Sequence, residues 1–487
     1  MKKIIYSLLI AGSLVTAGCN DFLDVKPKGN TIPELYDDFA RLLNAPSLGD
    51  ALYTHPMYLT DDVLLSNKNE GNSRFEFSGL KDAERNLFTF QHGQVFTPGN
   101  DDQLWNMAYK RIFTYNAVIN NIMSVPDATD EAKKRLMAEA MVGRAYEYLN
   151  LVNCYAKHYD KETAATDYGV PMVLSEEVGS QASYKRVSVA ETYAQIESDL
   201  TTAAPLLAKT VSNTFHPNQS IAYAFLSRMY LYMGDYAKAL TNANEALKVN
   251  QELIDYKLYE IKDGTQWGRI VLSSDKTMDF PDDIKSPENI YTRTFRNSNN
   301  LFWAVCASKD LLDTFSDELP EGAEDMRLKL FFCDGKMNPG SGFVHFPGFV
   351  MYAAYINVCC GFSTPEIYLI AAECEARIGS VSNALSHLNT LRDMRIRNNV
   401  HYTNTPEKTR AEVLKMTIDE RRREFVFNGI TRLVDLKRMN RESWFAKDIV
   451  HSADGETWTL PANDPRYILP IPNTVLEFNP DIPQYDR

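Results

Sequence analysis

Apolar residues recur at helical spacing over much of the chain, and this pattern predicts most of its secondary structure. Residues 104–123, 130–155 and 188–207 repeat apolar positions every three to four residues, the spacing that lines one face of an α-helix. Ser188 and Glu191 are spaced as a capping box at the start of the third segment. A shorter helix near the start of the chain is predicted from Leu35, Phe39, Leu42 and Leu43.

Residues 220–248 predict two antiparallel helices joined by a tight turn. The apolar pattern breaks at Gly234-Asp235, where glycine permits the backbone of a turn. Small side chains such as Ala222 and Ala243 would let the two helices approach each other closely. This is the pattern of a tetratricopeptide-like helical hairpin.

The hairpin pattern recurs, which predicts a stacked helical scaffold. A second copy covers residues 367–391 with its break at Gly379, and residues 130–155 with 188–208 look like a third copy with a longer connection. A single hairpin cannot bury its apolar face alone, so several copies imply that the hairpins pack on one another. The predicted fold class is therefore mostly α, and unrelated amphipathic helices are the alternative. The scaffold is expected at about residues 105–250 and 364–440.

Two long segments outside this scaffold lack helical periodicity. Residues 61–103 and 256–362 are rich in Gly, Pro, Asn or Asp and also carry many aromatic residues. Loops of this length in a compact domain usually have a function, although aromatic side chains there can also cover the core from outside. We therefore predict irregular structure in both segments and look for the binding residues there.

The first eighteen residues have the layout of a secretory signal. A basic start at Lys2 and Lys3 precedes an apolar stretch, too short to span a bilayer, that ends in small residues before Cys19. A cysteine directly after small residues is where bacterial lipoproteins are cleaved and acylated. We predict that residues 1–18 are removed and that Cys19 carries the lipid, with an ordinary secreted protein as the alternative. Thr16 stands where such signals usually have leucine.

Charge and cysteine usage narrow the classes of ligand. The formal net charge of −13 becomes −15 after removal of residues 1–18, because that segment carries two lysines and no acid. This acidity argues against nucleic acid as a ligand.

The six later cysteines form no C-x-x-C pair and no histidines have metal-ligand spacing, so neither a metal site nor a cofactor is predicted. Cys154 and Cys374 fall in apolar helical patterns and are expected to be buried free thiols. Spacing leaves the disulfide state open for Cys306, Cys333, Cys359 and Cys360.

Motifs from one end of the mature chain to the other resemble those of one protein family. Residues 19–27 read CNDFLDVKP, residues 224–236 read AFLSRMYLYMGDY, residues 420–425 read ERRREF and residues 469–472 read LPIP. Together with the hairpin at residues 366–392, these motifs resemble the SusD/RagB family of outer-membrane nutrient-binding lipoproteins of Bacteroidetes. The resemblance covers essentially the whole mature chain. One departure is the stretch Gly429–Arg432, which is one residue longer than the family's usual form.

The resemblance implies a single SusD-like domain over residues 19–487. It implies a lipid-anchored protein on the surface of the cell outer membrane, where it acts as a lid on a SusC-like TonB-dependent transporter and binds glycans for import. The tetratricopeptide-like half is expected to face the transporter, and the irregular half is expected to carry the ligand site. Relatives of the RagB type are associated with peptide uptake, so capture of peptides is the alternative function.

Sugar chemistry suggests which residues of the irregular segments form that site. Sugars present apolar C–H faces and hydroxyls, and binding them calls for exposed aromatic rings beside Asn, Asp or Arg. We expect a shallow site formed by Trp267, Tyr291, Arg293, Phe295, Asn297, Asn300, Asn72, Arg74 and Phe75.

A glycan-processing enzyme is the third function class considered, after glycan binding and peptide capture. The chain has no G-x-S-x-G, H-E-x-x-H or P-loop motif, and a glycosidase pair of carboxylates is a property of the tertiary structure. The sequence does not identify the glycan.

Two further motifs are predicted to be structural. Arg421, Arg422 and Arg423 stand beside Glu420 and apolar residues, which favours pairing with carboxylates between packed helices over a solvated face. The proline-rich end of the chain cannot continue a helix and is predicted to dock on the scaffold as an extended strap.

Overall fold

The structure is a computed structural model that describes most of the chain after residue 32. The described residues are 33–51, 54–70, 76–97, 102–176, 184–262, 269–295, 305–317, 319–337, 344–352, 357–402 and 408–487. The predicted signal at residues 1–18 and the predicted lipid-bearing Cys19 lie outside the described residues.

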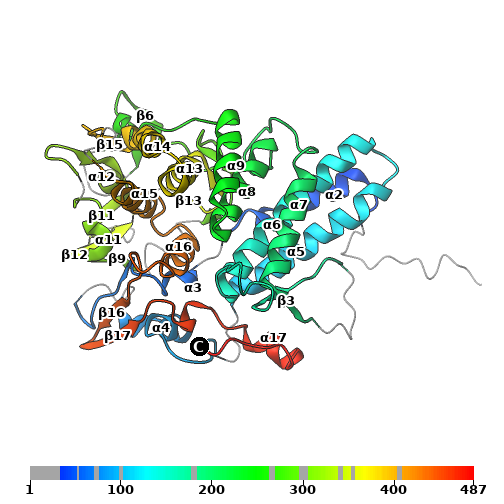
Figure 1. The fold of residues 1–487 in the computed structure, drawn as a ribbon, viewed down its shortest axis with the longest axis horizontal. Coiled ribbons are helices and arrows are strands. Elements are labelled where there is room, and N and C mark those ends of the chain that lie inside the picture. Colours follow the sequence, from blue (N-terminus) through cyan, green and yellow to red (C-terminus); the bar gives the residue numbers. More distant parts are fainter. Residues whose placement is uncertain are drawn as a thin grey trace, which may run out of the picture.

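Three long helices, α5, α6 and α7, lie side by side on one side of the molecule (Figure 1). Their first turns need acceptors for unpaired backbone N–H groups, and the side chains of Asp102 and Thr129 accept such bonds at α5 and α6. Ser188 and Glu191 form the predicted capping box at α7. The four helices predicted before residue 208 are confirmed, and the structure gives them as α2 (Tyr36–Leu43), α5 (Gln103–Asn121), α6 (Asp130–Tyr155) and α7 (Val189–Ala203).

The predicted hairpin at residues 220–248 is confirmed as α8 (Gln219–Met233) and α9 (Tyr236–Val249). Gly234 ends α8 with a φ of 74°, a left-handed conformation that glycine adopts without strain. The side chain of Asp235 then accepts the backbone N–H of Lys238 and caps α9. The turn chemistry therefore decides where the first helix stops and the second begins.

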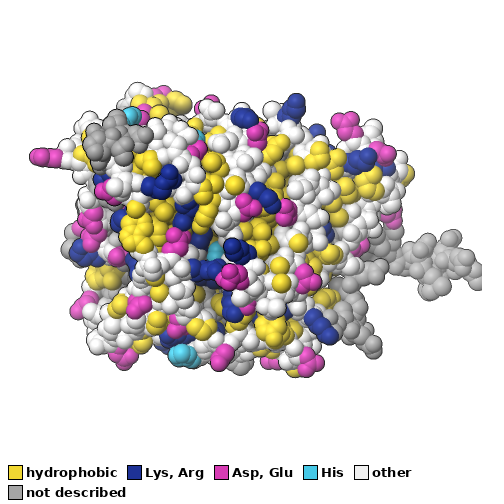
Figure 2. All heavy atoms as spheres, in the orientation of Figure 1, with side chains coloured by type: hydrophobic (Ala, Val, Ile, Leu, Met, Phe, Trp, Pro, Cys, Tyr) yellow, Lys and Arg dark blue, Asp and Glu magenta, His cyan; other side chains and the backbone are white. Residues whose placement is uncertain are grey.

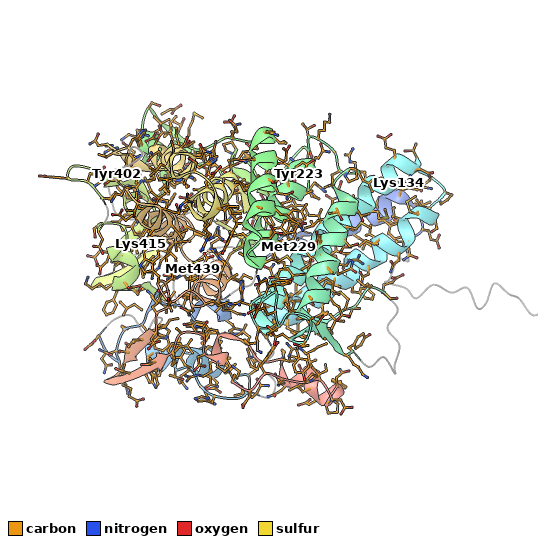
Figure 3. The ribbon with its side chains drawn as sticks, viewed as in Figure 1. Lys134, Tyr223, Met229, Tyr402, Lys415 and Met439 are labelled. Carbon is orange, nitrogen blue, oxygen red and sulfur yellow. The ribbon has the colours of Figure 1, made fainter. Side chains whose placement is uncertain are left out.

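The hairpins pack on one another, as their apolar faces require. α9 lies against α13, which pairs with α14 and with α15, while α7 joins α8 to the three-helix side (Figure 1). Met229 of α8 and Met439 of α16 lie near the middle of the molecule, and Lys134 of α6 lies at its edge (Figure 3). The mostly helical fold class is confirmed. The remaining scaffold helices are α13 (Thr364–Ile378), α14 (Val381–Arg395), α15 (Arg410–Glu424) and α16 (Thr431–Met439).

The described part of residues 256–362 consists of short strands, turns and two short helices. β4, β5 and β6 form a three-stranded antiparallel sheet, and β7 and β8 pair with β14 and β13. In Figure 1, β6, α11, α12, β11 and β12 lie on the side of the molecule away from α5–α7. β7 and β14 instead lie against α6, where Tyr146 contacts Tyr291 and Phe362. Their bounds are β4 (Tyr259–Ile261), β5 (Ile270–Leu272), β6 (Asp275–Asp279), β7 (Asn289–Tyr291), β8 (Thr294–Phe295), α11 (Lys309–Asp313), α12 (Met326–Phe331), β11 (Phe332–Met337), β12 (Val344–Tyr352), β13 (Val358–Cys359) and β14 (Phe362–Ser363).

Short elements at both ends of the chain complete the fold. β1 pairs with β9, β2 with β3, β10 with β15, and β16 with β17. The bounds are α3 (Thr54–Met57), β1 (Val63–Leu64), α4 (Asp82–Phe88), β2 (Tyr168–Pro171), β3 (Arg186–Ser188), β9 (Cys306–Ala307), β10 (Glu324–Asp325), β15 (Ile396–Arg397), β16 (Ile449–Ala453), β17 (Glu456–Leu460) and α17 (Asn473–Phe478).

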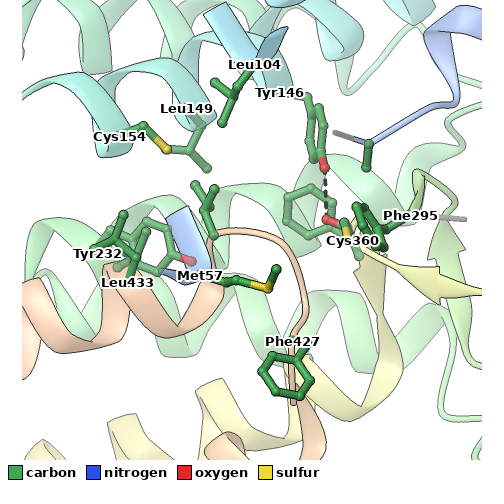
Figure 4. Close-up of a cluster of buried hydrophobic side chains, with 14 of the residues drawn as sticks. Met57, Leu104, Tyr146, Leu149, Cys154, Tyr232, Phe295, Cys360, Phe427 and Leu433 are labelled. Carbon is green, nitrogen blue, oxygen red and sulfur yellow. Dashed lines mark hydrogen bonds between the residues drawn. The ribbon is translucent and has the colours of Figure 1, made fainter. Parts of the chain in front are cut away.

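One large hydrophobic core joins the helical scaffold to the irregular region (Figure 4). Leu149 and Cys154 of α6, Tyr232 of α8 and Phe295 of β8 all belong to it. The hydroxyl of Tyr146 donates a hydrogen bond to the backbone oxygen of Cys360, with 2.9 Å between the two oxygens. The irregular region is therefore held on the scaffold by shared apolar burial as well as by hydrogen bonds.

The six cysteines of the described residues are free thiols. Cys154 and Cys374 are buried in α6 and α13, which confirms the prediction for both. The spacing left open whether Cys306, Cys333, Cys359 and Cys360 form disulfides, and in the structure all four are free thiols.

The three consecutive arginines of α15 pair with carboxylates between packed helices and loops, as predicted. Arg421 bonds to Asp435 of α16 with an N–O distance of 2.9 Å, Arg422 bonds to Asp62 at 2.8 Å, and Arg423 bonds to Glu420 at 2.8 Å. All three guanidinium groups are buried. Arg421 and Arg422 therefore tie α15 to α16 and to the segment at Asp62, while the Arg423–Glu420 pair lies within α15.

The end of the chain docks on the scaffold, in agreement with the predicted strap. The backbone N–H of Leu469 donates to the carbonyl of Cys154, and the backbone N–H of Gly93 donates to that of Arg487. The short helix α17 interrupts the extended path.

The described residues contain neither a membrane-spanning helix nor a cluster of metal-binding side chains. Every described helix is too short or too polar to cross a bilayer. The same residues hold no cluster of three or more His, Cys, Asp or Glu side chains arranged for a metal ion.

Candidate functional site

A cleft of about 510 Å³ lies between the irregular region and the ends of two scaffold helices. Its lining comes from the start of β5, the loop of residues 279–289, α12, β13, the start of α13 and residues 423–428 at the end of α15. Most of these residues belong to the larger of the two segments in which irregular structure was predicted. The volume lies in the range of small-molecule sites.

A buried network of ion pairs forms the floor of the cleft. Arg395 of α14 donates to Glu288 over 2.7 Å and to Glu424 over 2.8 Å, and Arg327 also pairs with Glu424. Burial raises the pKa of Glu288. Burial acts the same way on Glu424, but Arg395 and Arg327 outweigh it and lower the pKa of that carboxyl group. The Tyr256 ring stacks 3.9 Å from the guanidinium carbon of Arg395, so the floor is fixed in position.

Aromatic rings line the walls of the cleft. Phe280 makes edge contacts with Tyr256 and Phe331, with ring centroids 5.5 Å and 5.7 Å apart. Tyr352 packs its edge against Phe332 on the other side. Phe280 and Tyr352 keep part of their surface exposed. These rings can cover the apolar face of a sugar.

Polar side chains surround the opening. Arg269 and Asp279 form an ion pair of 2.9 Å between Nε and Oδ1, and about half of each side chain is exposed. Asn357 is exposed, while Asn289 and Asn428 donate to the carbonyls of Asp283 and Cys359. Aromatic walls with amide, carboxylate and guanidinium groups at the rim suit a ligand that has both apolar faces and hydroxyls.

The structure corrects three of the predicted binding residues. Tyr291, Arg293 and Phe295 were expected to be exposed, but their exposed fractions are 0%, 3% and 2%. β7 and β8, which carry Tyr291 and Phe295, pair with β14 and β13 beneath the surface, so both rings enter the core. The Arg293 guanidinium lies 3.8 Å from the Tyr291 ring and donates to the Thr292 carbonyl. In this conformation none of the three presents a surface to a ligand.

The remaining six predicted binding residues lie outside the described residues, so their position relative to the cleft is not described. They are Trp267, Asn297, Asn300, Asn72, Arg74 and Phe75. Their contribution to binding stays a prediction.

Sequence reasoning missed the residues that form the cleft. Glu424 lines the cleft although it is far from residues 279–289 in the sequence. Only the tertiary structure joins it to Glu288, through Arg395, which does not itself line the cleft. A usable signal was present in the loop around Phe280, where an aromatic residue stands among Asp and Pro. That is the same combination of residue types by which the other candidates were chosen.

The second predicted irregular segment borders different cavities. Residues 61–70 help line two cavities of about 430 and 370 Å³, together with the β16–β17 hairpin. Arg422 and Arg432 both pair with Asp61, so this segment is attached to α15 and α16. The first of these cavities is also lined by Ser308, Lys309 and Asp310, so the two predicted segments meet there and not at the cleft.

Comparisons with known proteins agree on one family. The family model described as "Starch-binding associating with outer membrane" matches residues 21–231, and the model described as "SusD family" matches residues 364–486. A comparison with curated proteins finds no match.

Solved structures share the fold over nearly the whole chain. A SusD superfamily protein from Bacteroides thetaiotaomicron is 23% identical, with a TM-score of 0.68 over 93% of this chain and 100% of its own. A putative sugar-binding protein from Bacteroides vulgatus is 21% identical, with a TM-score of 0.66 over 93% and 99%. A laminarin-binding SusD-like protein is 18% identical, with a TM-score of 0.60 over 92% and 98%. At these identities the likeness establishes the fold.

Proposed function

Because the chain belongs to the SusD/RagB family, we propose that it binds a glycan in the cleft between residues 279–289 and the end of α15. The family model for residues 21–231 describes starch binding in association with the outer membrane. One solved relative binds laminarin, a glucan. The glycan of this chain is proposed to be an oligosaccharide or polysaccharide taken up as a nutrient.

The cleft itself carries the proposal. Its floor is held by Arg395 and its walls expose part of Phe280 and Tyr352. A rigid floor favours binding because little conformational entropy is lost when the ligand arrives. The exposed Arg269 and Asn357 are free of the core and can donate to hydroxyls at the rim.

The proposal includes delivery of the glycan to a SusC-like TonB-dependent transporter in the outer membrane. Acylation of Cys19 would keep the protein at the cell surface, since several acyl chains each contribute about 0.8 kcal/mol per buried methylene. The tetratricopeptide-like helices would face the transporter and leave the cleft for the ligand. Co-purification with a SusC-like transporter from the native outer membrane tests this part of the proposal.

The arrangement of the two carboxylates in the cleft favours binding of a glycan over its hydrolysis. Glu288 and Glu424 both accept from the same guanidinium group, Arg395, and neither side chain is more than 7% exposed. A glycosidase needs two carboxyl groups that reach the glycosidic bond and exchange protons with it. Release of reducing sugars from a bound glycan by the purified protein would overturn this reading.

Calorimetry on a panel of ligands tests the main proposal. The panel contains starch and laminarin oligosaccharides, other neutral polysaccharides and a set of peptides. Saturable binding of one glycan class supports the proposal. Binding of peptides with no binding of any glycan would instead support peptide capture of the RagB type.

A further inference from the structure

A second cavity of about 460 Å³ opens on another part of the surface, between α16, the loop that follows α6 and the end of the chain. It shares no lining residue with the cleft described above. Figure 2 shows Lys, Arg, Asp and Glu side chains gathered near the middle of this face, between α16 and the α5–α7 helices. All of the cavity's lining residues belong to the described part of the chain.

Lys437 of α16 is a buried cation in the wall of this cavity. Its side-chain nitrogen donates to the backbone oxygens of Asn153 and Ala156, over 2.6 and 2.7 Å, at the end of α6. No carboxylate of the described residues forms an ion pair with it, although only 7% of the residue is exposed. An ammonium group has three N–H donors, so two carbonyls leave one donor for another partner. Burial lowers the pKa of Lys437 to about 8.

His158 lies next to this ammonium group. Its Nδ1 atom is buried and has no hydrogen-bond partner in the described part of the chain. Burial lowers the pKa of His158 well below its usual value, and the neighbouring charges of Lys437, Arg438 and Arg441 lower it further. The cavity therefore holds a buried ammonium group with one donor to spare, next to the carboxylates of its rim. The His158 ring also bonds to the backbone of Tyr232, so in the neutral imidazole the unpartnered Nδ1 atom is left as an acceptor.

The charged groups at the rim are mostly paired. Asp160 bonds to Arg441, Asp167 bonds to Lys157 and Asp464 bonds to Arg466. These carboxylates keep further lone pairs that can accept hydrogen bonds from hydroxyl groups. Asp486 lies at the exposed edge.

A buried cation without a counter-ion is costly, and a bound anion would offset that cost. We propose that this cavity is a second ligand site, which takes a small hydroxylated carboxylate such as a hexuronate, with its carboxylate on the ammonium group of Lys437 and one hydroxyl donating to Nδ1 of His158. The other hydroxyls would then face the carboxylates of the rim. The site does not depend on the proposed function of the first cleft.

Calorimetry with sodium glucuronate tests the proposal on the purified protein. Glucose lacks the carboxylate and acetate lacks the hydroxyls, so both are expected to bind at least about tenfold more weakly than glucuronate. Equal binding of acetate and glucuronate would overturn the hydroxyl part of the proposal. Absence of glucuronate binding would overturn the site.

Two variants assign the binding to this cavity. Lys437→Gln and His158→Leu are each expected to weaken glucuronate binding about tenfold or more. His387→Leu is the matched control, because His387 is a partly buried histidine of α14 that does not line the cavity. Unchanged affinity in both cavity variants would contradict the proposal. Loss of glucuronate binding in Arg269→Ala would place glucuronate in the first cleft and would also contradict it.

A measurement on the unaltered protein covers the case in which Lys437→Gln does not fold. Glucuronate is expected to shift the NMR signals of the His158 imidazole, assigned by comparison with the His158→Leu spectrum. Saturable shifts of that imidazole with glucuronate and not with glucose support the site. If the imidazole signals do not move while glucuronate binds, the ligand lies elsewhere and the proposal fails.

Discussion

Arg395 of α14 donates to Glu288 across 2.7 Å, and this contact joins a scaffold helix to the floor of the candidate cleft. The same guanidinium group also bonds to Glu424 at the end of α15 and to the backbone carbonyl of Ile254. One buried arginine therefore holds three segments that are far apart in the sequence. The shape of the cleft depends on the helical scaffold through this residue.

Loss of this arginine is expected to destabilise the whole protein. Arg395→Met leaves Glu288 and Glu424 buried without their shared cation, and breaking a buried pair in this way costs about 3–5 kcal/mol. Urea unfolding measures the change. Arg397→Met is the control, because that arginine forms an exposed pair with Glu324 and should change stability by less than about 1 kcal/mol.

Tyr291 and Trp267 are expected to behave differently when each is replaced by alanine. Tyr291 is fully buried, so Tyr291→Ala should lower the free energy of unfolding by about 3–5 kcal/mol. Trp267→Ala is predicted to weaken glycan binding without a change in melting temperature. Thermal unfolding and calorimetry on both variants test this contrast. A wild-type melting temperature for Tyr291→Ala would show that its ring is not part of the core.

Rim residues of the cleft are expected to affect binding and not folding. Arg269→Ala and Asn357→Ala remove exposed groups, so the free energy of unfolding should change by less than about 0.5 kcal/mol. Each lost hydrogen bond to a sugar hydroxyl should weaken binding about threefold to tenfold. Met278→Ala is a matched control, since Met278 is exposed on β6 next to the rim but does not line the cleft. An equal loss of affinity in all three variants would contradict the site.

Glu373 should make stability depend on pH in the acid range. Burial acts to raise its pKa, but Arg438 and Arg377 outweigh burial and lower the value from 4.5 to about 2. The stability that this carboxylate contributes is fully present above pH 4.5 and is lost as the pH falls towards 2. Glu373→Gln should therefore lower stability at pH 7 and flatten its fall between pH 4.5 and 2. Melting temperatures across this range measure the effect, with the exposed Glu477→Gln as control. An unchanged slope in Glu373→Gln would contradict the assignment.

Cys19→Ser is predicted to release the protein from the membrane. A serine cannot be acylated through sulfur, so the anchor that would hold the protein beside its transporter is lost. Membrane fractionation should find the variant in the soluble fraction, and growth on the cognate glycan should fall. Binding of the glycan by the purified variant should stay unchanged, which separates anchoring from recognition.

Local patterns determined the helices of this protein. The spacing of apolar residues and the caps at Ser188 and Gly234 predicted segments that the structure confirms. The pairing of Arg421 and its neighbours with carboxylates was also predictable, because charged groups beside apolar residues need partners when helices pack. The helices depend on residues close together in the chain, whereas the identity of the arginines' partners, such as Asp62 for Arg422, came only from the tertiary structure.

Only the tertiary structure decided which residues face a ligand. Tyr291 and Phe280 both stand among polar turn residues in the same irregular segment, yet strand pairing buries Tyr291 and leaves Phe280 partly exposed in the cleft wall. The side-chain partner of Glu288 is Arg395 of α14, more than a hundred residues away. Exposure and the identity of long-range partners are set by packing between distant segments, and no local pattern carries that information.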